Sequence, residues 1–278
     1  MSRQTYLAYL PEESRAREVL TVASSLARQR EGHLIGTYVM PPLTVYPMAG
    51  ELPQAVFDGH AEIHRASADA MRRRFDEATT GDRFVAEWRT VDAMVSPIAQ
   101  ALMPHVRSAD MIVAPYYSGD GHGPHGPVAE TLAMEGGRPV LMVPQHVAEE
   151  EVGQHITIAF DDSREASRAV FDAMDLLRNA KSVRLLSVGP PPRDGSNDAI
   201  PGAEMAATLA RRGIACEVDH VTPDGRSIGD VILGRVGDMG NDLLVMGIYG
   251  HSKLREFVFG GVTRHILRHM TVPVLVSR

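Results

Sequence analysis

The chain has 278 residues and a formal net charge of -7. This acidic balance argues against nonspecific nucleic-acid binding, for which a basic face is expected, and no apolar run approaches the roughly 18 residues that a membrane-spanning helix requires. The N-terminal segment lacks the cleavage-site pattern of a signal peptide, so we expect a soluble cytoplasmic protein. The single cysteine, Cys216, cannot form an intramolecular disulfide and is interpreted as a packing residue.

The length suggests two domains, because a usual α/β domain has about 100 to 200 residues. Apolar runs and helical patterns alternate from the first residues onward. The elements expected in the first half are strand 5–10, helix 14–29, strand 33–39, helix 60–78, strand 84–91, helix 97–105, strand 111–115, helix 128–135 and strand 140–143. The proline-rich segment 41–59 is interpreted as an excursion after the second strand.

The second half repeats this order. Its expected elements are strand 155–160, helix 164–179, strand 183–188, helix 204–212, strand 215–221, helix 228–239, strand 242–246, helix 262–269 and strand 274–277. Short apolar strands separated by helices are typical of a parallel sheet with helices on both faces. The acidic stretch 148–153 is the expected linker, which places the domains at 1–147 and 152–278.

An internal repeat supports the division into two halves. Asp110 precedes an apolar strand of the first half, and Asp242 precedes the matching strand of the second half. Pro139 and Pro273 likewise begin matching closing strands. Two independent matches in the same order indicate a duplicated domain.

The segment 246–267 carries the strongest functional signal. Gly247 and Gly250 open a loop after a buried strand, and Gly260 and Gly261 stand at the start of the last helix. Glycine lets a ligand approach the backbone, and a helix N-terminus offers unpaired N–H groups and the positive end of its dipole. This combination suits a phosphate, although glycines after a strand also serve only tight turns and helix caps.

The loop spacing, GxxG followed by nine residues and a further glycine, resembles the nucleotide loop of the universal stress protein family. The closing strand 273–276, the opening segment 158–163 and the duplication extend the resemblance to a tandem universal stress protein. The resemblance implies an α/β fold of two tandem open parallel-sheet domains. Each would be five-stranded and Rossmann-like, as in the adenine nucleotide alpha hydrolases. It also implies frequent dimerisation through the last strand and, in one branch, binding of an adenine nucleotide.

The resemblance places a nucleotide site in the second half. Asp161 matches the family's acidic position beside the nucleotide, where a carboxylate accepts bonds from ribose hydroxyls or helps to hold magnesium. Val188 matches the position whose backbone reads the adenine edge. The residues expected to bind ATP, together with magnesium, are Asp161, Val188, Met246, Gly247, Gly250, Gly260, Gly261, Val262 and Thr263. Asp162 or Ser163 is assigned to the cap of the following helix.

The chain departs from the family pattern in one residue of this site. Gly261 stands where the family has serine or threonine, which removes a hydroxyl bond worth about 0.5 to 1.5 kcal/mol. Thr263 and Ser252 remain nearby in sequence.

The first half departs further. Leu10 or Pro11 replaces Asp161, and Pro115 replaces Gly247, so we expect no ATP there. Asp120, His122 and His125 could bind a metal, but mobile surface histidines are the commoner explanation.

Two functions remain open. The chain is either a regulatory or stress-response protein that binds ATP in its C-terminal domain, or an interaction or structural module of the same fold that binds no nucleotide. Walker-lysine, GxSxG and paired-carboxylate signatures are absent from the sequence, so we expect at most slow ATP hydrolysis. The expected partner is an adenine nucleotide, with either a homodimer or only an intramolecular pseudo-dimer of the two domains.

Overall fold

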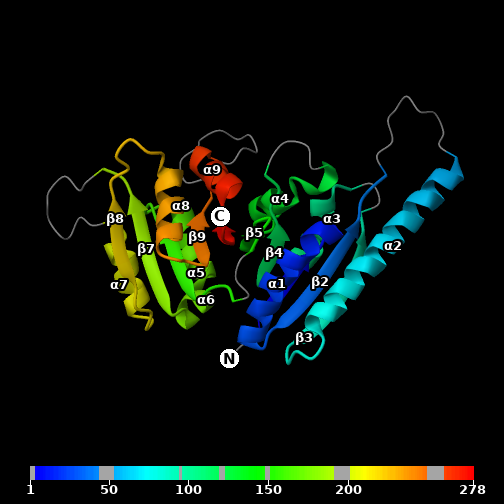
Figure 1. Cartoon of the computed structure of the whole chain (residues 1–278), viewed down its shortest axis with the longest axis horizontal. Helices are drawn as coiled ribbons and strands as arrows, with labels where there is room; N and C mark the ends of the chain where they lie inside the picture. Colours follow the sequence, from blue (N-terminus) through cyan, green and yellow to red (C-terminus); the bar gives the residue numbers. More distant parts are fainter. Residues whose placement is uncertain are drawn as a thin grey trace. The chain divides into compact units, whose positions relative to one another are not determined.

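The computed structural model describes residues 4–43, 53–93, 96–118, 123–147, 151–190, 201–248 and 260–278. The chain divides into two compact units, Met1–Arg138 and Pro139–Arg278, and each combines a sheet with surrounding helices (Figure 1). Within the described residues, no helix combines the length and the apolar composition that crossing a bilayer requires. The central part of the expected linker, 148–150, lies outside the described residues.

The first unit contains four parallel strands in the order β3-β2-β1-β4. Its elements are β1 (Thr5–Tyr9), α1 (Glu13–Arg30), β2 (His33–Met40), α2 (Gln54–Thr79), β3 (Val85–Asp92), α3 (Ile98–Val106), β4 (Met111–Pro115) and α4 (Val128–Glu135). The expected bounds are correct to within one residue except for α2, which begins at Gln54 instead of at 60. Pro53 occupies its N-cap with φ -58°, so the last proline of the excursion starts the helix early.

The second unit contains six strands in the order β5-β10-β9-β6-β7-β8. Its elements are β5 (Val140–Val143), β6 (His155–Ala159), α5 (Arg164–Asp172), α6 (Met174–Asn179), β7 (Ser182–Val188), α7 (Ala203–Ala210), β8 (Glu217–Val221), α8 (Ile228–Asp238), β9 (Leu243–Gly247), α9 (Gly261–His269) and β10 (Val274–Ser277). The single helix expected over 164–179 is interrupted at Ala173.

The expected α/β fold with a mostly parallel sheet is confirmed, and one antiparallel pair departs from the expected parallel arrangement. β5 groups with the second unit and pairs antiparallel with β10, so the sheet is mixed although mostly parallel. All four residues of β5 and all four of β10 are buried. A short and wholly apolar strand carries no local signal for its pairing partner, because the partner is chosen by hydrogen bonds between distant segments.

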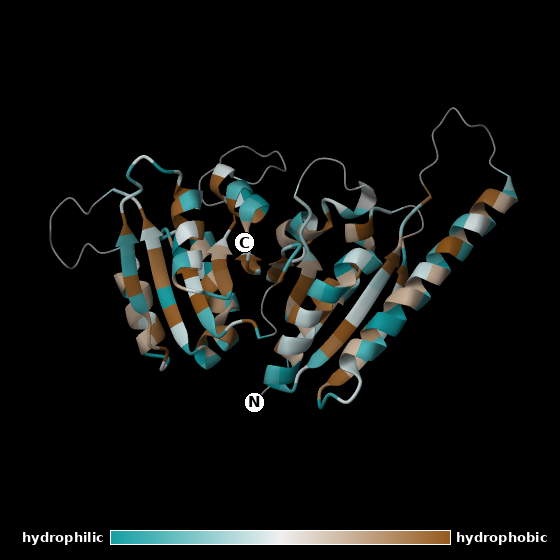
Figure 2. Ribbon diagram, in the orientation of Figure 1, coloured by the Kyte–Doolittle hydropathy of each residue, from teal (hydrophilic) through white to brown (hydrophobic). Residues whose placement is uncertain are grey.

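The core of each unit lies between the sheet and its helices. Figure 2 shows many hydrophobic residues in the strands and both hydrophobic and hydrophilic residues on the helices, and the buried hydrophobic residues come from both kinds of element. The repeated aspartates have matching positions in this framework. Asp110 accepts a hydrogen bond from the first N–H of β1 at 2.8 Å, whereas Asp242 accepts bonds from three N–H groups at or just before the start of β6 at 2.9, 2.9 and 3.1 Å. Both carboxylates therefore fix the amino ends of neighbouring strands.

The path of the chain through the second unit creates a switch in strand order. The chain runs from β6 outward to β7 and β8 and then returns to β9 and β10 on the other side of β6. Because crossovers between parallel strands are right-handed, α5 and α7 cover one face and α8 and α9 the other. Ligands of open α/β sheets bind outside the carboxyl ends of the strands at such a switch point, which here lies between β6 and β9.

Candidate functional site

A cavity of about 440 Å³ lies at the carboxyl ends of β6, β7 and β9. This volume falls within the range of about 300 to 1,000 Å³ that is usual for small-molecule sites. The cavity is lined by eight of the nine residues predicted from sequence, namely Asp161, Val188, Met246, Gly247, Gly260, Gly261, Val262 and Thr263. The ninth, Gly250, lies outside the described residues. The structure thus brings together residues from four separate segments of the second unit.

The remaining walls of the cavity were not predicted. They are apolar and are formed by Ala159, Phe160, Ala166, Leu186, Ile228 and Ile232. Ile228 and Ile232 are four residues apart and therefore share one face of α8. That spacing was visible in the sequence, but only the crossover of α8 shows that this face covers the ends of the strands.

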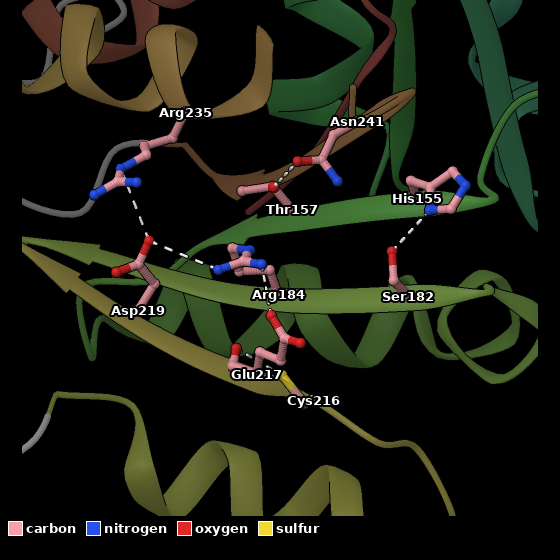
Figure 3. A network of polar contacts seen from close by, with 9 residues as sticks. All are labelled: His155, Thr157, Ser182, Arg184, Cys216, Glu217, Asp219, Arg235 and Asn241. Atoms are coloured by element: carbon pink, nitrogen blue, oxygen red, sulfur yellow. Dashed lines mark hydrogen bonds and ion pairs between the residues drawn. The ribbon is translucent and has the colours of Figure 1, made fainter. Parts of the chain in front are cut away.

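A charged network lies on the same side of the sheet, nearer the amino end of β7. Arg184 alternates with the cavity residues Leu186 and Val188, so all three point to one face. Its guanidinium bonds to Glu217 and lies 3.9 Å from Asp219, whose carboxylate is 3.8 Å from Arg235 of α8 (Figure 3). These ion pairs are partly exposed and contribute little stability individually, but they join α8 to β7 and β8.

The loop after β6 sets the position of Asp161. Asp161 Oδ1 accepts a hydrogen bond from the N–H of Ser163 at 3.1 Å, and Ser163 Oγ accepts one from the N–H of Ala166 at 3.1 Å. Ser163 is therefore the N-cap of α5, which decides between the two predicted cap residues. Asp162 adopts a left-handed conformation with φ 58°, a region that aspartate tolerates better than most residues.

The three described glycines that line the cavity differ in whether packing requires glycine at their positions. A Cβ on Gly247 would meet the backbone N of Ala166 and the backbone C of Glu165 at 2.4 Å, so the packing of β9 against α5 requires glycine there. Among the described residues, Gly260 and Gly261 face open space, because a Cβ on either would meet none of their atoms within 4 Å. Packing against α5 is therefore sufficient by itself to require glycine at position 247, which also lines the cavity. At Gly260 and Gly261 no described atom imposes this requirement.

The middle of α9 is held against the first turn of α8 beside the cavity. His265 Nε2 donates to Asp230 Oδ1 at 2.7 Å, and the Asp230 carboxylate also accepts a bond from Ser227 Oγ at 2.6 Å. Ser227 and His265 hold the pKa of Asp230 below its usual value. A Cβ on Gly229 would meet the His265 ring at 2.6 Å, so glycine permits this close approach of the two helices. His265 thus takes part in joining two walls of the cavity.

The corresponding place in the first unit is built differently. Tyr9 ends β1 as Ala159 ends β6, and its fully buried ring carries a hydroxyl that bonds to His125 Nδ1 at 2.8 Å. Burial lowers the pKa of His125. Asp120 and His122 of the suggested metal site lie outside the described residues, and the described residues contain no cluster that could hold a metal ion. A tyrosine side chain thus replaces the alanine that borders the cavity of the second unit.

The second unit matches a known protein family. Residues 153–278 match the model of the universal stress protein family. The C-terminal part of the chain therefore contains a universal stress protein domain. The universal stress protein Slr1230 of Synechocystis sp. is 34% identical over 70 residues, which are 25% of this chain and 23% of that protein. The match thus spans less than a quarter of the length of that relative.

Solved structures resemble the chain over almost its whole length. A universal stress protein from Archaeoglobus fulgidus has a TM-score of 0.73 and 16% identity, with coverage of 99% of this chain and 96% of that one. A structure from Pseudomonas aeruginosa has a TM-score of 0.57 and 14% identity, with coverage of 99% and 93%. At these identities the likeness shows the fold alone. The assignment of residues 1–147 to a second family domain stays a prediction.

Proposed function

We propose that the C-terminal unit binds ATP together with magnesium in this cavity, and that the chain is a regulatory or stress-response protein controlled by that nucleotide. The observation that carries the proposal is the convergence of eight predicted residues on one cavity at the switch in strand order. A universal stress protein domain in residues 153–278 supports it.

The chemistry of the cavity fits an adenine nucleotide. Phe160, Leu186, Val188, Ile228 and Ile232 provide apolar walls, which suit the faces of a planar base. The family resemblance adds that the backbone of Val188 reads the edge of this base.

The other end of the cavity suits phosphates. Gly260 and Gly261 leave the backbone at the start of α9 open, and the positive end of the helix dipole favours an anion. Asp161 is the carboxylate that would accept ribose hydroxyls or help to hold the magnesium ion. The bound nucleotide would supply phosphate charge that the helix start and magnesium compensate.

Calorimetry with ATP and magnesium tests the proposal. We expect the wild type to bind and Gly260→Val to lose binding, because the valine side chain would occupy the open space at the start of α9. Gly260 has φ -54° and ψ 153°, which valine adopts readily, so thermal unfolding should remain near that of the wild type. The matched control is Gly126→Val, because Gly126 precedes Val128 of the first half by two residues as Gly260 precedes Val262; it should leave ATP binding unchanged. Mass spectrometry of small molecules released from the purified protein gives a second readout.

The alternative is an interaction or structural module that binds no nucleotide. Gly261 favours this function, because the hydroxyl that the family places there is missing. No binding heat from the wild type, together with no released nucleotide, would support the module and contradict the proposal.

A further inference from the structure

The strand β3 lies at the end of the sheet of the first unit. In the described residues its only partner strand is β2, to which it pairs over eight residues. The N–H of Val85 donates to the Gly32 carbonyl at 3.2 Å, and the N–H of Ala93 donates to the Met40 carbonyl at 3.1 Å. The direction of the backbone N–H and C=O groups alternates from one residue of a strand to the next. The odd-numbered residues of β3 therefore direct these groups toward β2, whereas Ala86, Trp88 and Thr90 direct theirs away from it.

The edge has the composition of a strand that can accept a partner. It contains no proline, Ala86 and Thr90 are exposed, and Val85 is 50% exposed. An unpaired edge is a template for another strand unless charges, prolines or bulges block it. Glu87 and Arg89 are the charged residues that could block pairing along the middle of β3, with side chains 40% and 29% exposed.

The charge order of β3 permits one register of antiparallel self-pairing. In a register centred on Trp88, Glu87 of each copy lies opposite Arg89 of the other, and Val85 lies opposite Val91. Centring on Glu87 places two glutamates opposite each other, and centring on Arg89 places two arginines opposite each other. Like charges directly opposite destabilise a sheet, whereas opposite charges and apolar pairs stabilise it.

We propose that β3 is a self-complementary interaction edge, through which two copies of this chain pair antiparallel about Trp88. Both charges needed for this register are present, because Arg89 holds the pKa of Glu87 below its usual value through a 2.7 Å bond. The family's usual dimer strand is already engaged within the chain, since β10 pairs with β9 on one side and β5 on the other. A second copy therefore needs another edge. Among the described strands, β3 and β8 end the strand orders of the two units, and β3 carries the charge order that permits self-pairing.

Charge reversal tests the register. Sedimentation velocity at low salt should show a dimer for the wild type and at least roughly tenfold weaker association for both Glu87→Arg and Arg89→Glu, because each reversal creates two like-charge pairs. An equimolar mixture of the two variants should form a heterodimer, since arginines at 87 and 89 of one chain then face glutamates at 89 and 87 of the other. The control Arg65→Glu, on the exposed side of α2, should leave association unchanged.

Trp88 provides a direct probe of the same edge, because it is the only tryptophan of the chain. Its emission should shift to shorter wavelength as the wild-type concentration rises, and Arg89→Glu should abolish this shift. A wild type that stays monomeric at all concentrations, or a dimer that both charge reversals leave intact, would overturn the proposal. Failure of the mixed variants to associate would also overturn the proposal. Circular dichroism of each variant shows whether it is folded, so a folding defect cannot be taken for lost association.

Discussion

Replacing Gly261 by serine tests the proposed phosphate end of the cavity most directly. Gly261 is the first residue of α9 and lines the cavity, and a Cβ at this position meets no atom of the described residues within 4 Å. It is not among the residues with positive φ, so serine fits without backbone strain. The substitution restores the hydroxyl that the family resemblance places at this position.

The expected gain follows from one hydrogen bond. A hydrogen bond contributes about 0.5 to 1.5 kcal/mol net, and about 1.5 to 3 kcal/mol when one partner is charged. Since about 1.4 kcal/mol corresponds to a tenfold change in Kd, we expect Gly261→Ser to bind ATP with magnesium about tenfold more tightly than the wild type. Serine also raises helix propensity relative to glycine by roughly 0.5 kcal/mol, but this term acts on folding.

Gly261→Ala is the control that separates these effects. Alanine adds the same Cβ and stabilises α9 but carries no hydroxyl, so it should raise the unfolding midpoint without tightening the binding of ATP. Calorimetry gives Kd and thermal denaturation gives stability for all three proteins. If serine binds ATP no more tightly than alanine, the phosphates do not lie at the start of α9 and the reasoning is refuted.

Three further predictions concern stability. Gly247→Ala should lower the free energy of unfolding by at least about 2 kcal/mol, because its Cβ would meet the backbone N of Ala166 at 2.4 Å; an unchanged denaturation midpoint would contradict this packing requirement. Asp242→Ala removes the acceptor of three backbone N–H groups and should lower the free energy of unfolding by about 3 kcal/mol. Asp110→Ala loses one such bond and should lower it clearly less. Equal losses for the two variants would contradict this role of the carboxylates. Burial raises the pKa of the Glu130 carboxyl from 4.5 to about 7 in the folded protein. As the pH rises, the unfolded chain therefore loses this proton before the folded protein does. The free energy of unfolding should fall by up to about 3 kcal/mol as the pH rises from 4.5 to 7. Glu130→Gln should remove that fall in a pH series of urea denaturations, and a slope that persists would assign it to another group.

Most secondary structure could be predicted because its signals are local. The strand before the glycine loop is recognisable from four consecutive apolar residues, and α9 from its glycine start and the spacing of Val262 and Ile266. The start of α2 was missed because Pro53 can either continue a loop or cap a helix, and only the packed helix decides.

The candidate site was predicted in part for the same reason. Asp161, Gly260 and Gly261 stand at strand and helix ends, where polar or glycine residues interrupt apolar patterns. Ile228 and Ile232 look in sequence like any other core residues of a helix, so their place in the cavity wall could not be foreseen. The reason for Gly247 was likewise hidden, since the atoms that exclude a side chain belong to α5.

The sequence by itself determined the order and type of the elements, the duplicated pattern and the glycines at the start of the last helix, because each depends on residues close together in the chain. Tertiary structure alone decided that β5 joins β10, that the wall of α8 closes the cavity and that β3 is left at the end of its sheet. These features join segments far apart in sequence. Which segments meet depends on the direction of the crossovers and on hydrogen bonds between strands, and neither can be predicted from a local sequence pattern.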